Sequence, residues 1–279
     1  GVPSPAAVSP SSSCTIVPVP LVCAREGANA AILSRRPRTS ATRPLRAGVG
    51  SAWDHGPMLL EAERAQIVRY AQRMEQDGLS TGTAGNLSIR REELVAITPS
   101  RVPYGDLDAA AICVVRAEDG AQVEGAHGPS SELFLHLALY RDHGAGAVVH
   151  THPLHATALS TVLDELPPVH YLCAELGGGV RVAPYALFGT EALAAETSAA
   201  LRGRHAVLLA AHGAVTVGRS LAEAYARSVQ LEWAAKLYVT ANALGSPRAL
   251  SEAQVADVAA RLDELSYGSA RQGSTGAAS

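Results

Sequence analysis

The sequence predicts a single layered α/β/α domain with a mixed central sheet, and three observations support this fold class. About 220 residues follow an atypical N-terminal segment, which is enough chain for one sizeable core. Within that stretch, some segments carry apolar residues at helical spacing and others carry short apolar runs bounded by turn residues. The two kinds of segment alternate without an internal repeat, which favours a sheet covered by helices.

Residues 1–57 differ in composition from the rest of the chain. They are rich in Pro, Ser, Ala and Arg, contain Glu26 and Asp54 as their only acids, and show no sustained periodicity. Such a composition does not supply a buried apolar face, so we expect a disordered extension. An Arg-rich targeting segment is one explanation. A translation start assigned too early is the favoured one, because a well-patterned helix opens at Met58.

The remaining elements follow from apolar periodicity and turn residues. Apolar residues between Leu59 and Met74 recur at helical spacing, and Gly78 ends that pattern. A loop of small residues, Thr81 to Asn86, follows. Further helices are predicted at Ser131 to Arg141, His155 to Val162, Glu191 to Arg202, Leu221 to Leu244 and Ser251 to Leu265. Strands are predicted at Leu87 to Arg90, Leu94 to Thr98, Ile112 to Arg116, Ala147 to His150, Val180 to Ala183, Ala206 to Ala210 and Ala214 to Val217.

The motif His150-Thr151-His152 follows an apolar run that ends at Val149. Alternate residues of a strand point to the same face, so we expect both imidazoles to project together. Neutral imidazoles are good ligands for Zn²⁺ and similar ions, and catalytic zinc sites usually have three protein ligands. Glu132 and His212 each lie beside an apolar run and are candidates for the remaining ligands. Taken alone, the motif is as typical of an ordinary surface or core position as of a metal site.

Two segments of small residues suit a phosphate group. The glycines of Gly82 to Asn86 allow backbone N–H groups to approach an anion, and Asn86, Ser130 and Ser131 add side-chain donors. An ordinary turn and a helix N-cap are the alternative interpretations. The patterns GKS, GKT and GxGxxG do not occur at either segment, so neither is a Walker loop or a dinucleotide-binding loop.

Charge and cysteine content narrow the class of function. The net charge of −3 and the pI near 6.4 argue against a general nucleic-acid or anionic-membrane surface, and no apolar run reaches membrane-spanning length. Cys14, Cys23, Cys113 and Cys173 have no CxxC spacing, so free thiols in a reducing cytoplasm are the simplest expectation, although a disulfide is also compatible. We therefore expect a cytoplasmic enzyme with a small-molecule substrate.

Seven motifs resemble class II aldolases of the fuculose-phosphate aldolase type, in that family's order and spacing. The resemblance spans about Leu59 to Gly268. It is specific for the superfamily and less specific for the substrate, because ribulose-phosphate 4-epimerases, methylthioribulose-phosphate dehydratases and the non-enzymatic adducin head share the fold. The motifs are Gly82-Thr83-Ala84-Gly85-Asn86, Ile97-Thr98-Pro99-Ser100, Pro129-Ser130-Ser131-Glu132, Val148-Val149-His150-Thr151-His152, His170-Tyr171, Ala183-Pro184-Tyr185 with Phe188-Gly189-Thr190, and His212-Gly213.

The resemblance implies a domain organisation and an assembly. A catalytic domain at residues 58–268 would contain a mixed, largely antiparallel sheet, and residues 269–279 would form a flexible tail. Family members of this type are fourfold symmetric homotetramers with active sites between subunits. Tyr171 and Tyr267 match the tyrosines that a neighbouring chain contributes to each site.

The resemblance also implies a set of site residues. One Zn²⁺ per subunit, or another divalent ion, would be held by His150, His152, His212 and Glu132, with Glu132 acting in addition as the catalytic base. Arg101 departs from the family, because a glycine usually follows the Thr-Pro-Ser turn. It either alters the phosphate loop or adds a cationic contact. The residues implied for phosphate binding are Gly85, Asn86, Ser100, Ser130 and Ser131, with Arg101 beside them.

The implied reaction is reversible cleavage of a ketose 1-phosphate of the L-fuculose 1-phosphate type into dihydroxyacetone phosphate and a small aldehyde such as L-lactaldehyde. A divalent metal can stabilise the enediolate that carbon–carbon cleavage leaves. A Schiff base on Lys236 is the alternative, but this lysine occupies an ordinary position of a long amphipathic helix. His136, one turn after Glu132, is expected either to support the site or to pack in the core. Sister activities remain open: 5-deoxyribulose-1-phosphate aldolase, 4-epimerase, dehydratase or, remotely, an adducin-like interaction module.

Overall fold

The computed structural model describes residues 57–272, with side chains described as far as Leu265. The extension predicted at residues 1–57 therefore lies outside the described residues except for its last residue. The described part belongs to one compact unit. Its last helix continues to Gln272, beyond the point at which the flexible tail was predicted to start.

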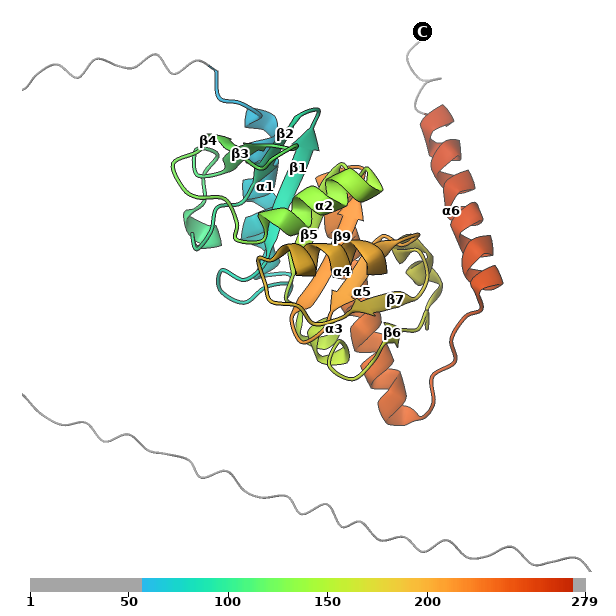
Figure 1. The fold of residues 1–279 in the computed structure, drawn as a ribbon. Coiled ribbons are helices and arrows are strands. Elements are labelled where there is room, and N and C mark those ends of the chain that lie inside the picture. The colour runs from blue at the N-terminus through green and yellow to red at the C-terminus, as the bar shows by residue number, and fades with distance from the viewer. Residues whose placement is uncertain (1–56, 273–279) are drawn as a thin grey trace, which may run out of the picture. The chain divides into compact units, whose positions relative to one another are not determined.

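A nine-stranded sheet forms the centre of the fold, in the order β4-β3-β2-β1-β5-β9-β8-β7-β6 (Figure 1). Neighbouring strands are antiparallel except for β7 and β8, which run parallel, so the predicted mixed, largely antiparallel sheet is confirmed. The strands are β1 Asn86–Arg91, β2 Leu94–Ile97, β3 Cys113–Arg116, β4 Gln122–Glu124, β5 Ala147–Thr151, β6 Glu165–Leu166, β7 Val180–Ala183, β8 Ala206–Leu209 and β9 Gly213–Gly218.

Helices cover both faces of the sheet, which confirms the layered α/β/α fold (Figure 1). On one face α2 and α4 pack on a core that includes Val148 and Val215. On the other face α1 and α5 pack on Leu87 and Val149, and α3 packs with α5 on Leu208. The helices are α1 Glu61–Met74, η1 Tyr104–Asp106, α2 Leu133–His143, α3 Leu154–Leu159, η2 Tyr171–Leu176, α4 Glu191–Leu201, α5 Leu221–Leu244 and α6 Glu252–Gln272.

The predicted elements all form, with small shifts at their ends. The helix predicted from Ser131 begins at Leu133, because the chain first makes a turn in which the Ser130 hydroxyl accepts a hydrogen bond from the Glu132 N–H at 3.2 Å. Two short strands, β4 and β6, and two 3-10 helices, η1 and η2, were not predicted. Cys113 and Cys173 are free and buried, while Cys14 and Cys23 lie outside the described residues.

Strand alternation decides which side chains face α2. In β1, Leu87 contributes to the core under α1 and α5, so Asn86 and Ser88 face the opposite side. In β5, Val149 contributes to that same core, whereas Val148 contributes to the core under α2 and α4. His150 therefore shares the α2 face with Asn86, its direct partner in the β1–β5 register. This face carries the candidate site at the end of β5.

Candidate active site

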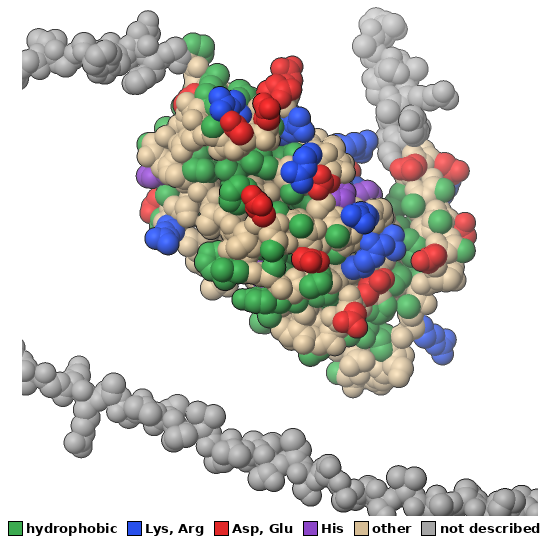
Figure 2. Space-filling view, viewed as in Figure 1, with side chains coloured by type: hydrophobic (Ala, Val, Ile, Leu, Met, Phe, Trp, Pro, Cys, Tyr) green, Lys and Arg blue, Asp and Glu red, His purple; other side chains and the backbone are tan. Residues whose placement is uncertain are grey.

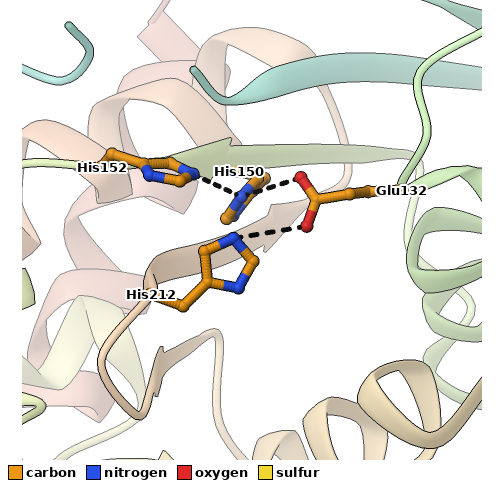
Figure 3. Close-up of side chains that lie close together, drawn as sticks. All are labelled: Glu132, His150, His152 and His212. Carbon is orange, nitrogen blue, oxygen red and sulfur yellow. Dashed lines mark hydrogen bonds and ion pairs between the residues drawn. The ribbon is translucent and has the colours of Figure 1, made fainter. Parts of the chain in front are cut away.

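Four side chains converge at the end of β5: Glu132, His150, His152 and His212 (Figure 3). Each offers one ligand atom, and these atoms all lie within 4.8 Å of one another. The three imidazoles contact each other edge to face, with ring centroids 4.7–4.9 Å apart. The structure thus brings together the two histidines of the His150-Thr151-His152 motif and both of the additional candidates.

Three separate elements hold the cluster in place. His150 lies in β5, and its Nδ1–H donates to the Ala214 carbonyl of β9 at 3.0 Å, so that Nε2 faces the centre of the cluster. His152 follows β5 directly, with its backbone N–H bonded to the Leu79 carbonyl at 2.9 Å. His212 lies in the tight turn between β8 and β9. Glu132 precedes the first residue of α2. Regular secondary structure therefore supports every candidate ligand.

Two glycines are required by the close packing around the cluster. A Cβ on Gly213 would lie 2.3 Å from the Thr151 carbonyl oxygen and 3.3 Å from the His152 ring. A Cβ on Gly85 would lie 2.6 Å from the His150 carbonyl oxygen, and its φ of +85° also favours glycine. Both positions let neighbouring backbone approach β5 at the point where the histidines project.

The arrangement of polar atoms fits a divalent cation. Glu132 Oε1 is buried without a hydrogen bond, and His212 Nε2 lies 3.4 Å from it. His150 Nε2 lies 3.0 Å from Glu132 Oε2 and 2.9 Å from His152 Nε2, so two ring nitrogens point at each other. Three imidazoles and a carboxylate are a common donor set for zinc, and the His150–Ala214 bond fixes the tautomer that a metal requires.

The charges of the cluster are interdependent. Burial opposes ionisation of Glu132, but His150, Asn86 and His212 outweigh it, so the Glu132 pKa lies well below its ordinary range. Burial also opposes protonation of His150, yet the Glu132 carboxylate raises its pKa. Burial and His150 lower the pKa of His152 to about 3 and also lower that of His212. The cluster thus offers a carboxylate, two neutral imidazoles and one proton that a metal would displace.

A pocket of about 510 Å³ opens beside the cluster. Glu132, His152 and His212 form part of its wall, and all six residues considered for phosphate binding line it as well. The Tyr104 hydroxyl is 2.7 Å from the Gly85 carbonyl oxygen and fixes the small-residue loop at one side. The six residues are Gly85, Asn86, Ser100, Arg101, Ser130 and Ser131.

Arg101 keeps the backbone that a glycine would adopt at its position. Its φ is +63°, in the left-handed region that side chains disfavour. Its side chain is exposed and lines the pocket, and it forms no hydrogen bond or ion pair with the part of the chain that the structure describes. A backbone of this kind does not need a glycine to form in this chain, and the cationic contact of Arg101 with a phosphate stays a prediction. Ala211, beside His212, also has a positive φ, of +53°.

Among the described side chains, that of Tyr171 is not brought into this pocket. Tyr171 lies at the start of η2, is 51% exposed, stacks on His170 with centroids 4.5 Å apart, and does not line the pocket. Tyr267 lies in α6, and its side chain is outside the described residues. Lys236 is exposed on α5, away from the pocket lining.

Two residues and one contact at the site were not singled out from the sequence. Tyr185 and Phe188, from the loop after β7, are 68% and 62% exposed and form an apolar rim of the pocket. Asn86 donates from Nδ2 to Glu132 Oε2 at 2.9 Å, a contact between positions 46 residues apart. Tyr185 and Phe188 belong to a motif that carried the family resemblance but was given no role at the site, and no local pattern indicated the contact between Asn86 and Glu132.

One face of the molecule mixes both signs of charge. On the face shown in Figure 2, Lys and Arg side chains are interspersed with Asp and Glu rather than gathered in a continuous basic surface. Within residues 57–272, no helix combines the length and the apolarity that crossing a membrane would demand.

Comparison with known proteins connects this site to a family. Residues 65–239 match the class II aldolase and adducin N-terminal domain. The chain is 38% identical over 209 residues to the 5-deoxy-D-ribulose 1-phosphate aldolase of Bacillus thuringiensis, covering 74% of this chain and 98% of that protein. It is also 38% identical over 196 residues to the L-fuculose phosphate aldolase of Escherichia coli, covering 69% of this chain and 90% of that protein.

The fold agrees with these matches. A solved L-fuculose 1-phosphate aldolase superposes with a TM-score of 0.70 and 34% sequence identity, over 72% of this chain and 96% of that chain. The matched region contains the whole convergent cluster, because Glu132, His150, His152 and His212 all lie between residues 65 and 239. The chain therefore belongs to the class II aldolase and adducin family and is one of its metal-dependent enzymes.

Proposed function

We propose that the protein is a zinc-dependent aldolase that reversibly cleaves a ketose 1-phosphate of the L-fuculose 1-phosphate type into dihydroxyacetone phosphate and a small aldehyde such as L-lactaldehyde. One observation carries this proposal. The convergent cluster of a carboxylate and three imidazoles adjoins a pocket that is also lined by phosphate-type donors. A ketose 1-phosphate carries a carbonyl group that a metal can bind and a phosphate group close to it, so its binding site needs metal ligands and phosphate donors in one pocket.

The metal is proposed to be one Zn²⁺ per subunit, held by His150, His152, His212 and Glu132. Zinc suits a set of imidazole and carboxylate ligands, although other divalent ions also bind such sets. When bound, the ion supplies Lewis-acid stabilisation for the negative charge of an enediolate, a contribution of several kcal/mol.

Glu132 is proposed as the base. Its Oε1 is buried without a hydrogen bond and adjoins the pocket, so it can receive the proton removed from C3 of dihydroxyacetone phosphate. Asn86 holds the other oxygen, Oε2, at 2.9 Å. In the cleavage direction the same carboxyl group returns the proton to C3.

The acid on the aldehyde side is proposed to come from a second subunit. Tyr171 is half exposed and does not line the pocket of its own chain, so its side chain is available to a neighbour in a homotetramer. There it would protonate the aldehyde oxygen in the direction of bond formation. Tyr267 is proposed for the same shared site.

The phosphate group is proposed to bind at Gly85, Asn86, Ser100, Ser130 and Ser131. These residues supply neutral N–H and O–H donors from three segments of the chain that all line the pocket. Arg101 is the only Lys or Arg in the pocket lining, so it provides the single full positive charge opposite a phosphate dianion.

A second candidate is a 5-deoxyribulose 1-phosphate aldolase. The relative from Bacillus thuringiensis has that name and shares the same 38% identity as the fuculose enzyme. Both reactions release dihydroxyacetone phosphate and differ in the aldehyde, which is acetaldehyde for the deoxypentulose and lactaldehyde for fuculose. A non-catalytic adducin-like module is disfavoured, because it has no need of the three imidazoles together with Glu132.

The decisive experiment incubates the purified, zinc-loaded protein with dihydroxyacetone phosphate and a panel of aldehydes that includes acetaldehyde and both lactaldehyde enantiomers. Preferred condensation with L-lactaldehyde would support the first candidate, and preferred condensation with acetaldehyde would support the second. No condensation with any aldehyde, combined with epimerisation of a ribulose phosphate or loss of water from methylthioribulose phosphate, would assign a sister activity instead.

A further inference from the structure

A chain of four hydrogen bonds leads from Glu132 into the interior between α2 and β1. Asn86 Nδ2 donates to Glu132 Oε2 at 2.9 Å, and Asn86 Oδ1 contacts His136 Nε2. His136 Nδ1 lies 2.6 Å from Ser88 Oγ, which in turn lies 2.5 Å from the Tyr140 hydroxyl. The proposed reaction uses Glu132 and Asn86 but gives no role to the other three groups.

The spacing of these five residues explains why they meet. Glu132, His136 and Tyr140 follow one another at intervals of four residues, so they lie along one face of α2, which Glu132 directly precedes. Asn86 and Ser88 alternate along β1 and point to the same side of the sheet. All five residues are at most 6% exposed, among apolar neighbours of the α2 core. Such a buried polar cluster is tolerated only when each member is hydrogen-bonded.

The charge on Glu132 gives the whole chain of bonds one direction. An ionised carboxylate only accepts hydrogen bonds, so the Asn86 amide must turn its NH₂ group toward Glu132. Its carbonyl oxygen then faces His136, which must carry a hydrogen on Nε2. Burial lowers the pKa of His136 to about 3, so the ring is neutral and Nδ1 accepts from the Ser88 hydroxyl. Ser88 Oγ is left to accept from Tyr140.

We propose that His136 is a positioning residue that fixes the direction of the Asn86 amide and thereby holds the Glu132 carboxylate ready for metal ligation and proton removal. This inference rests on the proposed function and deepens it. Without the Nε2–H donor, the amide can rotate and place its carbonyl oxygen against the carboxylate. Glu132 would then lose a hydrogen bond and gain a repulsive contact.

The first test compares His136→Leu with His136→Gln in the zinc-loaded enzyme. Leu keeps the approximate volume and removes the donor, so we expect kcat to fall about 10–100-fold, in line with lost partners of metal-binding side chains. Gln carries an N–H near the position of Nε2 and should recover most of kcat. His143, one turn after Tyr140 on α2, is the matched control, because its Nε2 contacts Ser198 outside the chain of bonds. His143→Gln should leave kcat unchanged.

A double-mutant cycle separates positioning from a packing role. If His136 acts through the Asn86 amide, His136→Leu should have almost no further effect on kcat in an Asn86→Ala background. A packing defect would reduce kcat equally in both backgrounds and would overturn the proposal. Full kcat in a folded His136→Leu protein would also overturn it. If His136→Leu does not fold, Ser88→Ala takes its place, because it removes the hydroxyl that donates to His136 Nδ1. Ser88→Ala should lower kcat when Asn86 is present and have almost no further effect in the Asn86→Ala background.

Two further measurements keep this inference separate from the proposed function. The zinc dissociation constant, measured by chelator competition, should rise for His136→Leu, recover for His136→Gln and stay unchanged for His143→Gln, whatever substrate the enzyme prefers. Nitrogen-15 NMR of the natural protein should show the His136 ring as the neutral Nε2–H tautomer. An Nδ1–H tautomer would refute the positioning role even if aldolase activity were confirmed. If the His136 tautomer and the zinc dissociation constants were as expected but the protein had no aldolase activity, only the proposed function would be refuted.

Discussion

The inner wall of the pocket and its outer rim differ in how they are built. The inner wall comes from the end of β5, the β8–β9 turn and the start of α2. Glu132 in this wall is 6% exposed, and His150 of the same cluster is 0% exposed. The rim comes from the loop after β7, where Tyr185 and Phe188 are 68% and 62% exposed. One chain completes the inner wall, whereas the rim presents apolar side chains without a partner among the described residues.

This difference suggests that the inner wall carries out the chemistry and that the rim serves subunit assembly and recognition. Groups that need fixed geometry are supported by regular elements and buried hydrogen bonds, such as the His150–Ala214 bond. Exposed aromatic side chains near a pocket are typical of surfaces that meet another molecule, and they agree with the proposed site between subunits. Substitutions in the inner wall should therefore abolish turnover. Changes farther from it should have graded effects.

The largest effect is expected from the metal ligands. His150→Ala, His152→Ala and His212→Ala should each lose most bound zinc and reduce activity to background, because each removes one arm of the cluster. Zinc content by elemental analysis and condensation of dihydroxyacetone phosphate with an aldehyde measure the two effects. His143→Ala is the control and should retain both. Full activity in protein rigorously stripped of metal would contradict the mechanism.

Glu132→Gln should give the next largest effect. The amide keeps the shape of the side chain but cannot remove a proton, so turnover should fall about 10²–10⁴-fold. A hydroxamate analogue of the enediolate should still bind to the zinc-loaded variant, measured by calorimetry. Unchanged turnover would assign the base to another group.

Tyr171→Phe tests the part of the site that we propose to come from a second subunit. Cleavage should slow by about 10–100-fold, while proton exchange at C3 of dihydroxyacetone phosphate should persist, because exchange needs only the base. Exchange is followed by NMR in deuterated water. Equal loss of exchange and cleavage would place Tyr171 outside the aldehyde-side role.

Mixed tetramers sharpen the same prediction. Subunits carrying Glu132→Gln, refolded with subunits carrying Tyr171→Phe, form some interfaces with one intact Glu132 and one intact Tyr171. Activity should therefore exceed that of either parent variant. If the mixture is no more active than its components, the two residues act in the same chain.

The sequence predicted the inner wall better than the rim, for a physical reason. Period-two alternation at the end of β5 was enough to predict that His150 and His152 project together. The contact between Asn86 and Glu132 depends on how α2 lies over β1, and no local pattern contains that information. Strands β4 and β6, of three and two residues, are too short to show periodicity. Tyr171 was selected by its motif, and its proposed partner belongs to another chain.

Arg101 should show a smaller effect, on binding rather than chemistry. Arg101→Ala removes the only full cation of the pocket lining, so KM for the sugar phosphate should rise several-fold with little change in kcat. Arg101→Gly should raise KM equally. It should also increase the free energy of unfolding by about 1 kcal/mol relative to Arg101→Ala, because glycine adopts the φ of +63° without strain. Equal stability of the two variants, or an unchanged KM, would contradict these assignments.

The smallest effect is expected from removing residues 1–57, which contain no residue assigned to the inner wall of the pocket or to its rim. Every residue assigned to the inner wall or to phosphate binding lies beyond Thr81, and the composition of residues 1–57 cannot repay an ordering cost of roughly 1–2 kcal/mol per residue. A chain beginning at Met58 should therefore keep the thermal midpoint, oligomer size and specific activity of the full chain. Scanning calorimetry, light scattering and the condensation assay measure these three quantities. If the shortened chain precipitated or dissociated into monomers, residues 1–57 would have to pack at a subunit interface. This segment could then cover part of the exposed rim formed by Tyr185 and Phe188.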